Sequence, residues 1–315
     1  MKHFRKKCVL GFFVSVFLAS LIWVVSLQGL NLAGEDNAIR FNKDDSMRTL
    51  ETKLQAMREE IKRNGDTFEV GMNSAMQYPL EELCSVNLNS KPENSTLYEN
   101  NEPKKMADLD PVFLPAYYMG YYTPIKNQGA MNDAWAYATM GVMEGNIKKV
   151  DGITVDLSEA FIFWCNVFGC NWFCHDMNMA PYGAVLECDY DPNGGYCPAI
   201  IPWSYRISGW GYVGNSYSVP TVSAIKQKIL AYGSVACGVY VDSYFQAYTS
   251  GCFSRNATGS INHFVLLVGW DESKCTTGAW RLKNCWGTGW GESGLMWIKY
   301  GVQKVGYAAN YVVYP

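Results

Sequence analysis

The sequence has little net charge and no paired CxxC motif. Its 26 basic and 29 acidic side chains nearly cancel and leave a formal charge of −3. Nucleic-acid binding needs a surplus of basic residues, so we expect no nucleic-acid partner. Cys170, Cys174 and His175 stand close together, but no second group of ligands has the spacing of a zinc site. We therefore expect no metal ion and no other cofactor.

Cysteines and apolar residues are plentiful. Apolar residues make up 49% of the chain and aromatic residues 15%, which is enough for a substantial core. Most of the eleven cysteines lie between residues 165 and 285. Their number and scattered spacing indicate disulfides that form in an oxidising compartment.

The N-terminus supports export. An apolar run over residues 8–27 follows a cluster of basic side chains, Lys2, Arg5, Lys6 and Lys7. The run has about the 20 residues that a helix needs to cross a bilayer. We assign residues 1–33 to a signal peptide or a membrane anchor, and the flanking basic residues favour an uncleaved anchor. Either alternative makes the protein extracytoplasmic, membrane-anchored or secreted, with the membrane as the partner of this segment.

Two triplets match the acceptor sequence for N-glycosylation. They are Asn94-Ser95-Thr96 and Asn256-Ala257-Thr258. Such triplets have a meaning only in a eukaryotic secretory pathway.

A helix is predicted over residues 46–63, after a polar stretch at 35–45 that we expect to be disordered. Its apolar residues recur at intervals of three, four and seven: Met47, Leu50, Leu54, Met57 and Ile61. The helix can be a coiled-coil stalk, a helix packed on its own domain, or part of a pro-segment. Residues 87–108 are rich in Asn, Glu, Lys and Pro and are predicted to be a linker.

The segment 127–138, Asn-Gln-Gly-Ala-Met-Asn-Asp-Ala-Trp-Ala-Tyr-Ala, is a glycine turn that leads into an apolar helix. It resembles the nucleophile segment of the papain-like cysteine peptidases, in which Gln and Gly precede Cys-Trp-Ala-Phe. The resemblance implies that Gln128 donates to a developing oxyanion, and that a thiolate would be activated at the helix start. Ala134 stands at the nucleophile position, and its methyl group cannot attack a carbonyl.

A second motif supplies the base. A cysteine peptidase needs a thiolate, a base that keeps it ionised and a group that orients the base. Asn262-His263-Phe264 offers an imidazole, and residues 283–292 read Lys-Asn-Cys-Trp-Gly-Thr-Gly-Trp-Gly-Glu. This resembles the family's Lys-Asn-Ser-Trp-Gly-x-x-Trp-Gly segment. The resemblance implies that Asn284 accepts a hydrogen bond from His263 and that Trp286 shields this bond from water.

Together the two motifs imply a set of site residues. Those for catalysis are Gln128, Ala134 (without function), His263 and Asn284, and those for substrate binding are Trp172, Phe173, Asn262 and Trp286. Residues 68–73 and then Leu80-Glu81-Glu82-Leu83 also resemble the end of a papain-family propeptide.

Several positions depart from the family pattern. Trp172-Phe173 follows Cys170-Asn171 where the family has two glycines that pair with the substrate backbone. Met131 stands where the family has a disulfide cysteine, and the Asp133 charge would raise the pKa of a thiol at position 134. Cys285 takes the place of the family's serine and is expected to point away from the cleft.

The resemblance also bears on the disulfides. It implies that Cys165 forms a bridge within the helical lobe, with Cys197 as its best partner. Cys170 has lost its usual partner and is expected to pair with Cys174 or Cys188, or to stay free.

The predicted fold class is α+β. Further elements are a helix at residues 223–231 and strands at 235–241, 264–268, 279–283, 295–300 and 309–313. The resemblance implies the papain-like two-lobed fold, with a helical lobe, a β-barrel-like lobe and a cleft between them. Residues 34–107 are the propeptide-like helix and linker, and residues 108–315 are the papain-like peptidase domain.

Three functions remain open. We favour an exported papain-like homologue that is inactive in peptide-bond hydrolysis and keeps a cleft for a peptide or protein ligand, because several independent positions depart from the family. The first alternative is an active cysteine endopeptidase, represented by a variant in which alanine has replaced the cysteine at 134. The second is a surface interaction module that uses the aromatic-rich residues 164–196.

Overall fold

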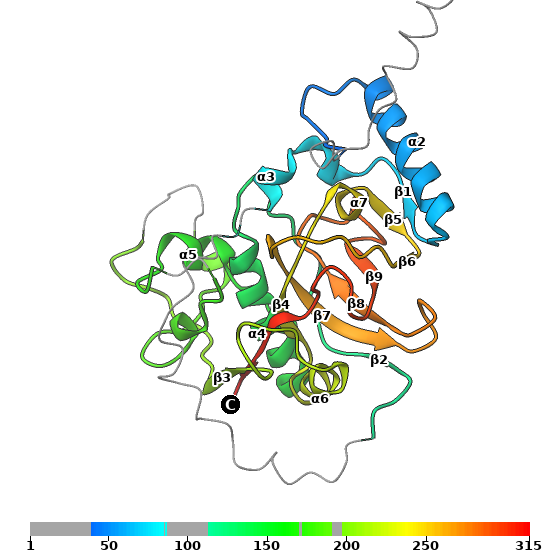
Figure 1. Cartoon of the computed structure of the whole chain (residues 1–315). Coiled ribbons are helices and arrows are strands. Elements are labelled where there is room, and N and C mark those ends of the chain that lie inside the picture. The colour runs from blue at the N-terminus through cyan, green and yellow to red at the C-terminus, as the bar shows by residue number, and fades with distance from the viewer. Residues whose placement is uncertain (1–38, 85, 87–112, 170–171, 191–196) are drawn as a thin grey trace, which may run out of the picture. The chain divides into compact units, whose positions relative to one another are not determined.

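The protein is an assembly of helices and mainly antiparallel strands, in agreement with the predicted α+β class (Figure 1). The structure, a computed structural model, describes residues 39–84, 86, 113–169, 172–190 and 197–315. Within these ranges no helix is long and apolar enough to cross a bilayer. The predicted membrane segment, residues 1–33, and the predicted linker, residues 87–108, lie outside the described residues.

An eight-stranded sheet carries the C-terminal half of the chain. Its order is β3-β10-β4-β7-β8-β9-β6, and β2 pairs with β7. Neighbouring strands are antiparallel except for β6 and β9. The strands are β2 (Tyr117–Met119), β3 (Gly209–Tyr212), β4 (Val235–Val239), β6 (Cys252–Phe253), β7 (His263–Asp271), β8 (Ala279–Lys283), β9 (Leu295–Lys299) and β10 (Tyr307–Val313). The five predicted strands coincide with or overlap β4, β7, β8, β9 and β10.

The helix α4 (Ala134–Asp151) is the central helix of the fold. It is buried on nearly every side and packs against β7, β4, β10 and the helix α5 (Glu159–Trp164). Gly145 allows a close approach to the segment after β2, because a Cβ atom there would lie 2.7 Å from the carbonyl oxygen of Tyr121. The helix therefore places its first residue, Ala134, in the interior, where only 4% of that residue is exposed.

Further helices flank the sheet. The predicted helix 223–231 is α6 (Val222–Tyr232), which Gly233 terminates, and Ser158 caps α5 by accepting a hydrogen bond from the Phe161 backbone N–H at 3.2 Å. The described part of the peptidase-like region also contains the short helix α7 (Ser243–Gln246) and the 3₁₀ turns η4 (His175–Asn178) and η5 (Glu187–Asp189).

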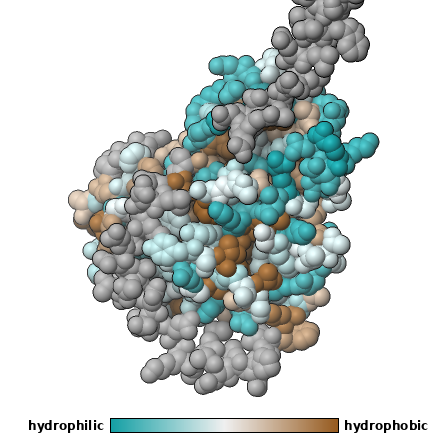
Figure 2. Space-filling view, viewed as in Figure 1, coloured by the Kyte–Doolittle hydropathy of each residue, from teal (hydrophilic) through white to brown (hydrophobic). Residues whose placement is uncertain are grey.

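The segment that precedes the peptidase-like region packs on it. It contains α2 (Met47–Asn64), β1 (Glu69–Val70), η1 (Ser74–Gln77) and α3 (Leu80–Leu83), and β1 pairs with β5 (Tyr248–Ser250). Four of the five predicted apolar positions of α2 are buried, whereas Met47 is exposed. Hydrophilic side chains cover the outward side of this segment (Figure 2).

The prediction of disorder at residues 35–45 was wrong for residues 39–45. Phe41 is buried, with 1% of its surface exposed, and the Lys53 ammonium donates to an Asp45 carboxylate oxygen at 2.6 Å. An apolar contact and a charged contact with later residues hold this stretch, and neither is visible in its local composition.

Two disulfides are described in full. Cys165–Cys197 confirms the predicted pair, and Cys252–Cys275 is a second bridge. Cys174 is disulfide-bonded too, while Cys188 is free and exposed. The prediction for Cys170 falls outside the described residues. Such bridges are typical of oxidising compartments and indicate an extracytoplasmic protein.

Candidate functional site

The imidazole of His263 and the amide of Asn284 form a buried pair. His263 is the first residue of β7, and its Nε2 lies 2.8 Å from Asn284 Oδ1. Neither residue has more than 2% of its surface exposed, and the Trp286 ring lies 4.9 Å from the imidazole, centroid to centroid. With Nε2 as the donor, Nδ1 is the acceptor nitrogen, and no described group bonds to it. Burial lowers the pKa of His263 to about 4, although its bond to Asn284 opposes this shift.

Gln128 is held beside this pair by backbone and side-chain contacts. Its backbone N–H donates to the Cys285 carbonyl at 2.8 Å. Its side-chain Nε2 donates to the Met131 carbonyl at 2.6 Å and to the Leu83 carbonyl at 3.2 Å. Gln128 Nε2, the donor that the sequence assigns to a developing oxyanion, is thus already hydrogen-bonded to the Leu83 carbonyl of α3. The bonds to Met131 and Cys285 also hold the glycine turn without the family's disulfide at position 131.

Asp133 precedes Ala134 at the start of α4. It is the N-cap residue, but its carboxylate makes no capping bond, and its Oδ1 is buried without a partner. Burial raises the pKa of Asp133 to about 7. The Asp133 carboxyl is therefore only partly ionised near neutral pH, and it carries its full negative charge only at a pH well above 7.

The Cys285 side chain is buried and turns toward Gln128. Its Sγ donates to Gln128 Oε1 at 2.9 Å, and only 7% of the residue is exposed. Burial, followed by the charge of Asp133, raises the pKa of the Cys285 thiol well above its usual value. This thiol is adjacent to the site, but it is protonated and engaged with Gln128.

The aromatic residues assigned to substrate binding lie in the interior. Trp172 and Phe173 have 1% and 4% of their surfaces exposed, and each ring lies 4.7 Å from the Phe264 ring. In this conformation they offer a peptide no surface. The side chain of Asn262 is also occupied, since it exchanges hydrogen bonds of 2.7 and 2.8 Å with the Val241 backbone.

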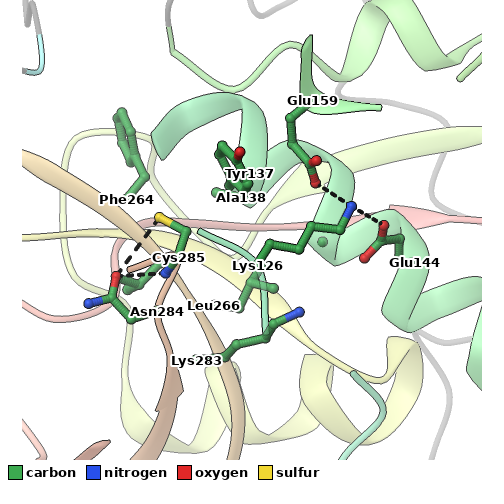
Figure 3. Close-up of a pocket in the computed structure, with 12 residues that line it drawn as sticks. Lys126, Tyr137, Ala138, Glu144, Glu159, Phe264, Leu266, Lys283, Asn284 and Cys285 are labelled. Atoms are coloured by element: carbon green, nitrogen blue, oxygen red, sulfur yellow. Dashed lines mark hydrogen bonds and ion pairs between the residues drawn. The ribbon is translucent and has the colours of Figure 1, made fainter. Parts of the chain in front are cut away.

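A buried ion cluster lies next to Cys285. The Lys126 ammonium is 2.9 Å from Glu144 and 2.7 Å from Glu159 (Figure 3). It also lies 2.7 Å from Asp156, whose side chain is exposed. Lys126, Glu144 and Glu159 border a cavity of about 20 Å³, room for about one water molecule. Burial raises the pKa of Glu159, against the opposing effect of Lys126. The cluster ties the turn before Gln128 to α4 and α5.

Sequence reasoning missed the contact of α3 with the site. Leu83 lies 45 positions before Gln128 and bonds to it, and the neighbouring Cys84 is buried. The resemblance of residues 80–83 to the end of a propeptide was the one signal that pointed to this segment.

Comparison with known proteins identifies relatives of the peptidase-like region. The family described as papain family cysteine protease matches residues 116–315. The gamete and mating-type specific protein A of Dictyostelium discoideum is 32% identical over 202 residues, which are 62% of this chain and 44% of that protein. Cathepsin K of Gallus gallus is 27% identical over 216 residues, which are 62% of this chain and 61% of that protein. The chain spans about half the length of the curated relatives it matches.

A solved structure supports the fold. The digestive procathepsin L2 proteinase from the larval midgut of Tenebrio molitor superposes with a TM-score of 0.69 at 20% identity. The superposition covers 94% of this chain and 99% of that one. At this identity the likeness shows the fold alone.

Proposed function

Because this chain belongs to the papain family of cysteine proteases, we propose that it is a member that does not hydrolyse peptide bonds. Ala134 occupies the nucleophile position at the start of α4, and a methyl group cannot form the acyl-enzyme. The observation that carries the proposal is the combination of this alanine with an otherwise assembled site, in which His263 Nε2 lies 2.8 Å from Asn284. The domain acts as a scaffold whose cleft binds a peptide or protein segment.

Nearby thiols do not replace the nucleophile. Cys285 donates to Gln128, and burial keeps its pKa well above the usual thiol range, so the reactive thiolate is scarce. Cys84 is buried as well, and its pKa is raised in the same way. Neither group combines a low pKa with access to a substrate.

The cleft is occupied by the chain itself. Leu83 accepts a hydrogen bond from Gln128, Ser74 Oγ donates to the Trp286 carbonyl at 3.3 Å, and Asn73 donates to the Gln246 carbonyl at 2.8 Å. These contacts support the proposal that the segment 40–84 acts as a propeptide and that an external ligand binds only after residues 74–84 withdraw. We further propose that residues 1–33 anchor or export the chain.

The test is the variant Ala134→Cys, assayed on fluorogenic peptides at acid and neutral pH, with the segment 40–84 attached and after its proteolytic release. We expect turnover far below the typical enzyme median of about 10 per second. At neutral pH the partly ionised Asp133 opposes formation of a thiolate. At both pH values Trp172-Phe173 replaces the glycines that would align the substrate. Formation of the Cys165–Cys197 bridge serves as the check that the variant has folded.

The matched control is the double variant Ala134→Cys/His263→Asn. Turnover near the enzyme median in the single variant, lost in the double variant, would contradict the proposal. It would favour the alternative, an active endopeptidase in which one substitution removed the nucleophile. Slow alkylation of the new thiol without turnover agrees with the proposal, because His263 and Asn284 can still assist a thiolate.

A further inference from the structure

We propose that Asn256 carries an N-linked glycan. It begins the triplet Asn256-Ala257-Thr258, and such triplets arise by chance, so the tertiary structure must decide whether the folded chain accepts a glycan there. The relevant features are the exposure of the acceptor amide, the loop that holds it and the compartment in which the chain folds.

The triplet lies on an irregular surface loop. Residues 254–262 follow β6 and precede β7 without forming a helix or a strand. Asn256 and Thr258 are both exposed. A glycan at this position replaces no sheet hydrogen bond and displaces no core side chain.

The loop holds the acceptor amide in one orientation. The Gln303 backbone N–H donates to Asn256 Oδ1 at 3.2 Å, and the Ala257 backbone N–H donates to Gln303 Oε1 at 2.9 Å. Gln303 is fully buried, so this reciprocal pair directs Oδ1 toward the protein. Asn256 Nδ2, the atom that carries a glycan, has no hydrogen-bond partner among the described residues. The side-chain oxygen of Asn256 is thus held by Gln303, whereas its amide nitrogen is available to solvent.

The neighbouring residues place the loop at the contact with α2. Arg255 donates to Asp242 at 3.0 Å and to Glu60 of α2 at 2.8 Å, and Ser254 donates to Asp66. In Figure 1 the strand β6 lies near β5, β1 and α2. A glycan on Asn256 therefore stands beside the junction between the segment 40–84 and the peptidase-like region.

The compartment supplies the co-reactant. The Cys252–Cys275 bridge, close in sequence to the triplet, indicates an oxidising environment such as the secretory pathway. There the donor is a lipid-linked oligosaccharide pyrophosphate. The C1–O bond to the pyrophosphate breaks, a bond forms between C1 and Asn256 Nδ2, and the amide loses one proton as the lipid pyrophosphate leaves.

The experiment uses the full chain, produced in eukaryotic secretory cells with Asn94→Gln so that one acceptor triplet remains. Removal of N-glycans with peptide-N-glycosidase should shift its electrophoretic mobility by one glycan and convert Asn256 to aspartate in the peptide map. Thr258→Ala should abolish both signals although Asn256 is retained, and the matched Thr258→Ser should keep them.

Three results would overturn the proposal. The first is an unmodified Asn256 in chains in which the Cys252–Cys275 bridge has formed. The second is an equal mobility shift in Thr258→Ala. The third is recovery of Cys252 and Cys275 as free thiols, because the chain would then not pass through the compartment that holds the glycan donor.

Discussion

Acid destabilises this protein through His175, a buried histidine outside the candidate site. Its Nε2 lies 2.7 Å from Asn310 Oδ1, and its ring lies between Phe173 and Trp210, with centroids 6.0 and 5.2 Å away. Asn310 Nδ2 donates to the Ala308 carbonyl at 2.8 Å, which directs Oδ1 to the imidazole. Burial lowers the pKa of His175 from 6.5 to about 4.

The sign of the effect follows from proton binding. The unfolded chain takes up a proton on this imidazole below pH 6.5, whereas the folded chain resists it until about pH 4. The stability is therefore fully present above the unfolded pKa and is lost as the pH falls toward the folded one. At about 1.36 kcal/mol per pKa unit the full loss is about 3 kcal/mol, of which about 2 kcal/mol is lost by a pH of about 5.

The assay is denaturant unfolding of the wild type and His175→Gln at a pH of about 7.5 and of about 5. We expect the decrease in unfolding free energy between these conditions to be smaller in the variant by about 2 kcal/mol. Comparing the two proteins cancels the opposite contribution of Asp133, whose raised pKa favours folding at low pH. An equal decrease in unfolding free energy between the two pH values in both proteins would refute the reasoning. This holds even if His175→Gln is less stable than the wild type at both pH values.

Two further predictions concern buried groups. Lys126→Met should lower the unfolding free energy by about 3 to 5 kcal/mol near neutral pH, because Glu144 and Glu159 lose their common cation. A loss below about 1 kcal/mol in chemical denaturation would contradict this role of Lys126. A thiol-alkylating reagent should modify the exposed Cys188 in the native protein, whereas the buried Cys285, with its raised pKa, should react only after denaturation. Modification of Cys285 in the native protein, detected by mass spectrometry, would contradict this prediction.

Local patterns in the sequence sufficed for much of the secondary structure. The apolar spacing of α2, the helix that ends at Gly233 and the strand β8 were predicted because amphipathic period and capping residues act over a few neighbouring positions. Two long motifs identified the family, and through it the Cys165–Cys197 bridge and the His263–Asn284 pair.

The tertiary structure decided how the site is filled. The Cys285 thiol turns to Gln128, Trp172 and Phe173 pack on Phe264, and Leu83 bonds to Gln128. None of these contacts leaves a periodic or motif signal, because each depends on which surfaces meet when distant segments pack. The identity of Ala134 is written in the sequence, but its burial, with only 4% of its surface exposed, comes from packing alone.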